Sequence, residues 1–354
     1  MSQKDGKVLL DTLIATKTEH NLKIRSNDSK FDVSTITLNP TTNKYTINTY
    51  VQINPDKWHL SEVPAASGNN QAQKSKITYT NIPYDGVFLF RTTHANSMSS
   101  SWSNYSQTIN YDRALPTDVG YIILPNYGKY MFTELTSAET VSDFSKASNT
   151  VKQNFNKPAG VTNFNTLLFG SPTAGDYGKS MVLYSSAIFH NQQFDLQYPQ
   201  TVIQEFILRN TYTDADNCYH LYEHSGTTVP SEIDFASKAD FTITNSTLQG
   251  FSIKYENDKA SSYTITWVST DASLDAHWSL YVSPDESAFN PKEYLEKSNS
   301  KMLAGKNVTT FKLKSVRSQK VKDYSHQDML DYRAKPTAAS KKRLEQYRTI
   351  TKPF

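Results

Sequence analysis

The residues from Lys44 to Ile53 alternate so cleanly that they constrain the fold of this chain more than any other segment. One face carries, in order, Tyr45, Ile47, Thr49, Val51 and Ile53. Successive side chains of a β-strand point to opposite faces, so this period of two predicts a strand with one buried face. The strand-like residues Phe31 to Leu38 precede it, and the link from Asn39 to Asn43 contains Pro and Asn, which favour turns. The folded part of the chain therefore begins with a β-hairpin.

Short strand patterns recur along most of the remaining chain. We expect strands at Ile77 to Asn81, Gly86 to Thr92, Val119 to Leu124, Met181 to Phe189, Val202 to Arg209, Phe241 to Thr244, Phe251 to Tyr255, Tyr263 to Val268, Trp278 to Val282 and Val308 to Leu313. A capping-box pattern predicts a short helix at Ser137 to Lys146, and an Asn cap followed by Pro predicts another from Asn290 to about Lys297. The absence of long strand–helix alternation favours an all-β fold, an antiparallel β-sandwich or jelly roll, as one elaborated unit or two consecutive ones.

The composition supports a folded chain. Hydrophobic residues make up only 37% of the sequence, but it contains 22 Tyr and 17 Phe, and its net charge is only +3. Disordered chains are poor in aromatic residues and high in net charge. The single cysteine, Cys218, excludes an internal disulfide. We expect this residue to be small, buried and apolar in character, rather than a nucleophile activated by the nearby His220.

The C-terminal residues differ from the rest of the chain in charge. From Lys312 to Phe354 there are 12 Lys/Arg and 4 Asp/Glu, a net of +8, so the residues before them carry −5. We expect a basic, helical C-terminal tail over residues 314–354, with helices at Asp328 to Ala334 and Ala338 to Tyr347. The other expected parts are an N-terminal arm (1–30), a β-sandwich or jelly-roll part with long loops (31–195), and a second β part of the same or a second sandwich (196–313).

The basic tail is the best candidate for a contact with another molecule. Its candidate residues are Lys312, Lys314, Arg317, Lys320, Lys322, Lys341, Lys342, Arg343, Arg348 and Lys352. Cations that neutralise phosphates release counterions and give salt-sensitive binding to nucleic acid. The same charges fit an acidic neighbouring subunit equally well, because composition carries no information on base readout. Deletion of Lys314 to Phe354 is expected to weaken assembly or cargo binding while the body stays folded.

One short pattern raises the possibility of metal chemistry. The segment from His220 to His224 reads H-x-x-E-H, as in inverted zinc peptidases, where both His bind zinc and the Glu acts as base. That geometry needs a helix, so that His220 and His224 lie one turn apart and Glu223 stays beside them. The competing interpretation, which we favour, is a strand from Cys218 to Tyr222 followed by a polar turn. The weak metal candidates are therefore His220, Glu223 and His224.

Aromatic residues raise a second possibility, a sugar-binding surface. Trp267 and Trp278 lie in strand patterns and are expected in the core. Trp102 lies in the polar stretch Thr93 to Ser106 and is the candidate for an aromatic side chain on an exposed loop. The sequence contains no P-loop, dinucleotide-binding or G-x-S-x-G pattern, so we predict no catalytic residue and no cofactor.

The start of the chain does not read as a targeting segment. Residues 1–7 are polar, and the apolar stretch from Val8 to Ile14 is interrupted by Asp11 and Thr12. No run of the roughly 20 apolar residues that span a bilayer is present. We expect a protein made in the cytoplasm without a signal peptide, and no membrane span.

In general character, the short strands rich in Asn, Ser, Thr and Tyr, the long loops and the basic terminus resemble the jelly-roll coat proteins of viruses. The resemblance is to a class, over Phe31 to Leu313. It implies a virion structural protein, not an enzyme, that assembles with copies of itself through sheet surfaces and terminal arms. Many such proteins carry the basic arm at the N-terminus, whereas residues 1–30 here are not strongly basic. The alternatives are a carbohydrate- or receptor-binding β-sandwich of a viral appendage, and a zinc hydrolase.

Overall fold

The computed structural model contains mostly β-strands, so the predicted all-β class is confirmed. The structure describes residues 1–3, 7–13, 29–53, 73–83, 87–94, 99–103, 108–113, 116–155, 157–176, 179–186, 196–255, 260–298, 300–334 and 345–354. Within these ranges there are two α-helices, and no helix is both long and apolar enough to cross a membrane.

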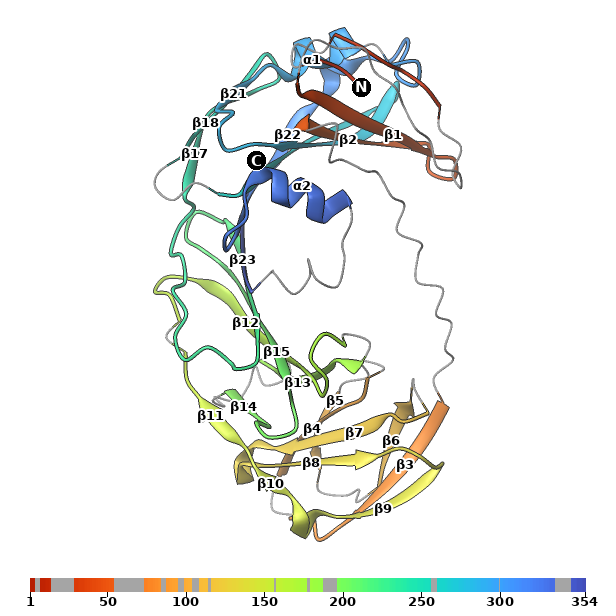
Figure 1. Ribbon diagram of the computed structural model, residues 1–354, viewed down its shortest axis with the longest axis vertical. Helices are drawn as coiled ribbons and strands as arrows, with labels where there is room; N and C mark the ends of the chain where they lie inside the picture. The colour runs from red at the N-terminus through yellow and green to blue at the C-terminus, as the bar shows by residue number, and fades with distance from the viewer. Residues whose placement is uncertain are drawn as a thin grey trace.

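The largest feature is a ten-stranded sheet that runs through most of the molecule (Figure 1). Its strands, in spatial order, are β1 (Phe31–Asn39), β2 (Lys44–Ile53), β20 (Leu274–Val282), β19 (Ser262–Asp271), β22 (Lys312–Val321), β23 (Gln346–Pro353), β16 (Tyr219–Gly226), β15 (Glu205–Thr213), β12 (Thr162–Ser171) and β13 (Met181–Ser185). All neighbours are antiparallel except β2 and β20, which are parallel. The predicted hairpin of β1 and β2 is therefore confirmed and forms one edge of this sheet.

Four smaller sheets surround the large one. They are β10 (Ser148–Asn149), β8 (Lys129–Glu134), β7 (Val119–Leu124), β4 (Val87–Thr92) and β5 (Ser99–Ser103); β6 (Thr108–Arg113), β3 (Gln73–Thr80) and β9 (Glu139–Asp143); β17 (Phe241–Thr247), β18 (Gly250–Tyr255) and β21 (Ala288–Phe289); and β11 (Val151–Gln153) with β14 (Leu196–Tyr198). β3 and β9 are parallel. We call β1, β2 and β17 to β22 the upper lobe, and β3 to β16 the lower lobe, as they appear in Figure 1.

β23 is the strand that joins the two lobes within the large sheet. It is antiparallel to β22 on one side, in the upper lobe, and to β16 on the other, in the lower lobe. Its central residue, Ile350, is fully buried, and its direct neighbours across the two ladders are His220 and Ser318. A strand with two neighbours has hydrogen-bond partners for backbone groups along both edges. The backbone of β23 therefore supplies the hydrogen-bond partners that water would otherwise supply to the facing edges of β22 and β16.

The core of the upper lobe lies between two sheets. Trp267 and Trp278 of the large sheet are 1% and 0% exposed and share one cluster with Phe251 of β18. The indole nitrogen of Trp278 donates a hydrogen bond of 2.9 Å to Thr49. The sequence-based expectation that both tryptophans belong to the core is correct.

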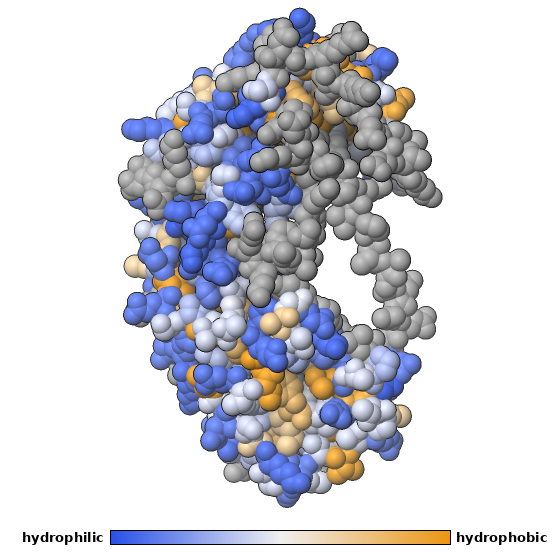
Figure 2. All heavy atoms as spheres, in the orientation of Figure 1, coloured by the Kyte–Doolittle hydropathy of each residue, from blue (hydrophilic) through white to orange (hydrophobic). Residues whose placement is uncertain are grey.

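The lower lobe has three layers. On one face of the five-stranded sheet, Phe90 and Ile123 pack with Leu208 and other residues of the large sheet. On the opposite face, Ile122 packs with Tyr79 and other residues of the β6–β3–β9 sheet. This two-sided packing explains why β7 is buried at nearly every position instead of alternating. On the side of the molecule seen in Figure 2, apolar residues show mainly on this lobe.

The helices agree with the sequence in part. α1 (Pro291–Ser298) is where the Asn–Pro pattern predicted it, and Asn290 accepts a hydrogen bond of 3.1 Å from the backbone N–H of Glu293. The helix predicted at Ser137 to Lys146 is wrong. That segment forms β9 and a short 3-10 helix, η2 (Phe144–Lys146), because pairing of β9 with β3 overrides the local capping signal. Two further 3-10 helices among the described residues are η1 (Pro125–Tyr127) and η4 (Val308–Thr310).

The basic tail is not the helical arm that its charge pattern suggested. α2 (His326–Ala334) confirms one predicted helix, but β22 begins at Lys312 and crosses the expected boundary at residue 314. Most of the second predicted helix lies outside the described residues, and its end, at Gln346 and Tyr347, is part of β23. Deletion of Lys314 to Phe354 would therefore remove two central strands, and the body cannot stay folded as expected.

The position of β23 makes its buried side chain a sensitive test of the joint. Replacing Ile350 by Ala leaves a cavity in the core on one face of the sheet and should lower the free energy of unfolding by about 3 kcal/mol. The neighbouring change Lys352→Ala should cost about 0.5 kcal/mol or less, because that side chain is not fully buried. Guanidinium unfolding followed by circular dichroism measures both, and equal effects would contradict the assigned register.

Candidate functional site

The H-x-x-E-H segment lies on strand β16, not on a helix. Alternate side chains of a strand point to opposite faces, so His220 and His224 share one face and Glu223 lies on the other. Glu223 instead pairs with Arg209, whose Nε and Nη2 lie 2.9 and 2.7 Å from Oε2. The helical arrangement of the peptidases is therefore absent. The strand of the alternative interpretation is present, but it continues to Gly226, so the polar turn expected after Tyr222 is not formed.

His220 belongs to a buried polar pair beside β23. Its Nε2 lies 2.7 Å from Oδ2 of Asp214, and both side chains are 1% exposed. The other carboxylate oxygen of Asp214 accepts the backbone N–H groups of Asp216 and Cys218, both at 2.9 Å. The ring of Tyr212 stacks on the imidazole with centroids 4.6 Å apart. Asp214 therefore orders the β15–β16 turn and also fixes the orientation of His220.

Cys218 is fully buried in this turn. Burial, together with the neighbouring charge of Asp214, raises the pKa of its thiol to about 11. A thiol must be deprotonated to act as a nucleophile, so this one is inert at neutral pH. The expectation of a small buried residue is met.

Two histidines lie beside β23, and a third lies at the start of α2 in the upper lobe. His220 and His224 of β16 are paired in register with Ile350 and Gln346 of β23, and His326 begins α2, where its Nδ1 lies 3.2 Å from Oγ of Ser262. Burial lowers the pKa of all three imidazoles, that of His326 to about 4. Asp214 opposes this effect at His220, and Glu345 opposes it at His224. The folded joint therefore favours neutral imidazoles.

This arrangement predicts a loss of stability in acid. An unfolded His has a pKa near 6.5, so the unfolded chain takes up protons as the pH falls below that value while the folded joint resists them. Stability is present above about pH 6.5 and is lost toward pH 4, with up to about 3 kcal/mol from His326 alone. Denaturant titrations at several pH values measure it. His326→Gln should flatten the profile, and the exposed His277→Gln should change it less; equal profiles would contradict the assignment.

The structure places the predicted basic residues in three groups. Lys312, Lys314, Arg317 and Lys320 lie on β22, with Lys322 just after it, and Arg348 and Lys352 lie on β23. Lys341, Lys342 and Arg343 lie outside the described residues. The first two groups form parts of two adjacent strands, and so they belong to the body of the fold.

Several of these charges are used within the chain. Arg348 lies 3.2 Å from Asp240, which also accepts a hydrogen bond from Ser318. Lys322 lies 3.5 Å from Glu345. Such pairs fasten β23 to its surroundings, so these residues are poor candidates for an external partner.

Three of the cations remain directed to solvent, and a histidine that the sequence did not indicate joins them. Lys312, Lys314 and Arg317 are exposed, and no ion pair to them occurs among the described residues. Arg317 donates a hydrogen bond of 3.1 Å to Thr351. His277 of β20 is exposed on the same face; burial lowers its pKa, and so does the charge of Lys314. We call these four residues the basic face.

The aromatic candidate Trp102 lies on strand β5 and is paired with Phe88, and its side chain is outside the described residues. A hollow of the upper lobe lies at the β17–β18 turn, lined by Ser246, Thr247, Leu248, Gln249, Trp267, Thr309, Phe311, Lys312, Leu313 and Phe354. Trp267 and Phe311 are only 1% and 3% exposed there, whereas Phe354 is 51% exposed, so the indole of Trp267 is not the exposed aromatic side chain of this hollow.

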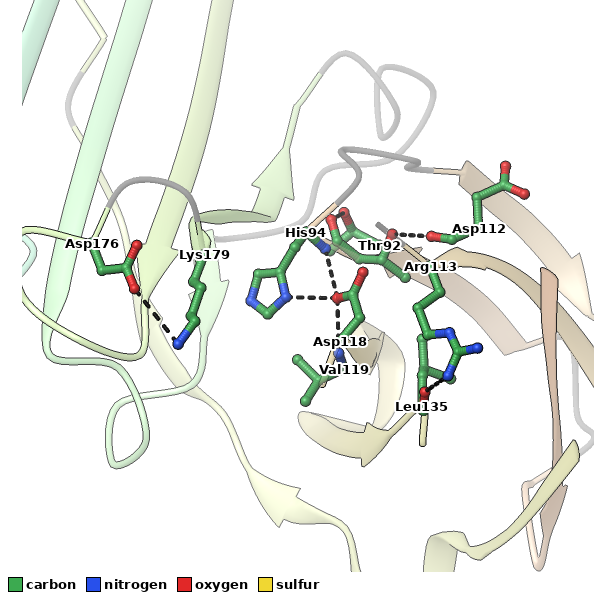
Figure 3. A network of polar contacts seen from close by, with 10 residues as sticks. Thr92, His94, Asp112, Arg113, Asp118, Val119, Leu135, Asp176 and Lys179 are labelled. Carbon is green, nitrogen blue, oxygen red and sulfur yellow. Dashed lines mark hydrogen bonds and ion pairs between the residues drawn. The ribbon is translucent and has the colours of Figure 1, made fainter. Parts of the chain in front are cut away.

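A second buried contact between a histidine and an aspartate, which no sequence pattern indicated, lies in the lower lobe (Figure 3). Nδ1 of His94, just after β4, is 2.6 Å from Oδ1 of Asp118, just before β7, and the side chains are 4% and 0% exposed. The same oxygen accepts backbone N–H groups from Val119 at 2.8 Å and His94 at 3.2 Å. Nε2 of His94 has no hydrogen-bond partner among the described residues. The contact holds the end of β4 beside the start of β7.

Asp118→Ala should therefore lower the free energy of unfolding by about 3 kcal/mol, because it leaves two backbone donors without their acceptor and removes the carboxylate that lies against the His94 ring. A matched control is Asp176→Ala in the same region, which removes an exposed pair to Lys179 at 3.7 Å and should cost below about 1 kcal/mol. Urea unfolding compares the two variants. A smaller effect at Asp118 than at Asp176 would contradict the structural role.

Within the described part of the chain, no group of three or more His, Cys, Asp or Glu side chains is arranged to hold a metal ion. No protein-family model matches the sequence, and a search of curated proteins finds no significant match.

Proposed function

We propose that this protein is a structural subunit, of the kind that forms the coat of a virion, and that it assembles with copies of itself through the edges of its sheets. The class resemblance to jelly-roll coat proteins suggested this function. The observation that carries it is the outer edge of β1, which is open to another strand and lacks the features that normally prevent such pairing.

The direction of the β1 backbone follows from its contact with the N-terminal segment. Ser2 donates to the carbonyl of Asp32 at 2.9 Å, and Asp32 donates to that of Ser2 at 2.8 Å. Backbone groups of alternate residues in a strand point to the same side, so Ser34, Ile36 and Leu38 also point outward. Within the described ranges, no strand pairs with this edge beyond Asp32. The outer edge of β1 therefore pairs with the N-terminal segment at Asp32, and its backbone N–H and C=O groups at Ser34, Ile36 and Leu38 point to the same side.

The composition of β1 suits intermolecular pairing. From Val33 to Asn39 it contains no charge, no Pro and no Gly. Proteins that stay monomeric usually protect edge strands with Lys, Pro or a bulge. The irregularity in the β1–β2 ladder lies between Phe31 and Val33, before the open part, and Leu38 is 38% exposed. An unprotected edge of this composition favours association with a further strand.

A second edge lies in the opposite lobe. β9 is the edge strand of its sheet, and its Val141 is 72% exposed. In Figure 1, β1 and β9 lie at opposite ends of the molecule. Two separate contact edges allow each copy to bind two neighbours, which an extended shell or layer requires.

The function is tested by blocking the edge without disturbing the hairpin. Leu38→Pro removes an outward N–H that β2 does not use, so assembly should weaken by about tenfold or more while the fold persists. Leu38→Ala keeps the N–H and serves as the matched control. Sedimentation velocity and negative-stain microscopy measure assembly. Wild-type protein that remains a lone protomer at high concentration, or normal assembly of Leu38→Pro, would contradict the proposal.

A further inference from the structure

We propose that the basic face binds the phosphodiester backbone of a nucleic acid, without reading its sequence. The inference rests on the proposed function, since it assigns the cargo that a coat subunit of this kind would hold. Of the basic candidates of the sequence that the structure describes, it selects Lys312, Lys314 and Arg317, and it adds His277.

The four groups lie on one side of the sheet. Lys312 is in register with Val268, and Val268 with His277, while Leu313 beside Lys312 turns into the core. The ladder shifts between Thr266 and Trp267, which makes Lys314 the extra residue of β22. Lys314 and Ser315 therefore both lie opposite Thr266, on the face away from Leu313, and Lys314 is exposed there. The large sheet therefore gathers these cations from β20 and β22 across the intervening β19.

The dimensions of the basic face suit a chain of phosphates. Lys312 and Arg317 are five residues apart on β22, roughly 15 Å at about 3.3 Å per residue. β20 is two strands from β22, so His277 lies about 10 Å to the side. Phosphates of one strand follow each other at about 3.4 Å along a duplex axis. The cations can therefore contact several consecutive phosphates.

The positive charge of this face is not balanced within the described part of the chain. Asp275 of β20 lies two residues before His277, and its carboxylate is paired with Lys44 at 3.2 Å. By contrast, Arg348 and Lys322 have acidic partners. Lysine and arginine without such partners are the groups that exchange counterions for phosphates.

The neighbouring side chains favour nucleic acid over a protein partner. Ser315, Thr264 and Thr46 lie in adjacent positions of the same face, and hydroxyls are common donors to phosphate oxygens. The centre of a protein–protein interface is usually apolar and aromatic. A face of cations and hydroxyls lacks such a centre, so an acidic segment of a neighbouring copy is the less suitable occupant.

The test is the salt dependence of binding to a fluorescein-labelled 20-nucleotide single strand, measured by anisotropy on the full chain. Lys312→Gln/Lys314→Gln/Arg317→Gln should weaken binding at least tenfold at low salt. It should also reduce the slope of log K against log salt by about 2, since each single-strand contact contributes about 0.7. The control Lys74→Gln/Lys129→Gln/Lys146→Gln removes the same charge from the lower lobe and should retain the wild-type slope.

Two outcomes would overturn the inference: equal binding by the two triple variants, or equal competition by an acidic peptide of the same charge. Repeating the titration on Leu38→Pro protein separates binding from assembly. If the wild type assembles and the basic face has no effect on binding, only this inference fails. If neither the wild type nor any variant assembles, but binding of the oligonucleotide still depends on the residues of the basic face, the proposed function fails and the inference stands.

Discussion

The structure depends on the two-sided pairing of β23. The chain builds part of the upper lobe with β1 and β2, forms the lower lobe with β3 to β16, and returns to complete the upper lobe with β17 to β22. Each lobe has its own buried cluster. Only when β23 enters between β22 and β16 does hydrogen bonding connect the two half-sheets. The ion pair of Arg348 and the buried side chain of Ile350 secure this strand on the core side. His220 and His224 are paired with this strand, so the stability of the joint is linked to the protonation of these two imidazoles.

The sequence predicted what depends on local pattern and missed what depends on distant pairing. The alternation from Lys44 to Ile53 and the Asn290 cap are local signals, and both are present in the structure. Gln346 to Pro353 reads as part of a basic tail, because its strand-forming residues Tyr347, Thr349, Ile350 and Thr351 make a short run that follows the cluster Lys341 to Arg343. Its paired residues lie 26 to 132 residues earlier, and no local pattern reveals them. The helix expected at Ser137 to Lys146 was wrong for the same reason.

For the candidate site, the sequence showed which residue types are abundant, but it did not show which of these residues lie together in the fold. The excess of cations after Lys312 was visible, but only the ladders separate those that face solvent from those that bind Asp240 or Glu345. His277 lies 35 residues before Lys312 and had no recognisable spacing. Conversely, His220 and His224 had a recognisable spacing that the strand geometry makes irrelevant. The open edge of β1 and the basic face belong to the same sheet, so a strand added at the edge would continue the surface that carries the cations.

The late position of β23 in the chain has a consequence for biosynthesis. During translation, β16 is complete about 120 residues before β23 is made, and β22 is complete about 25 residues before it. At synthesis rates of roughly 5–20 residues per second, the facing edge of β16 waits unpaired for several seconds or more. The nascent polypeptide thus exposes unpaired strand edges while it is on the ribosome. The yield of folded protein in cells therefore depends on keeping the edges of β16 and β22 from pairing with other chains until β23 is made.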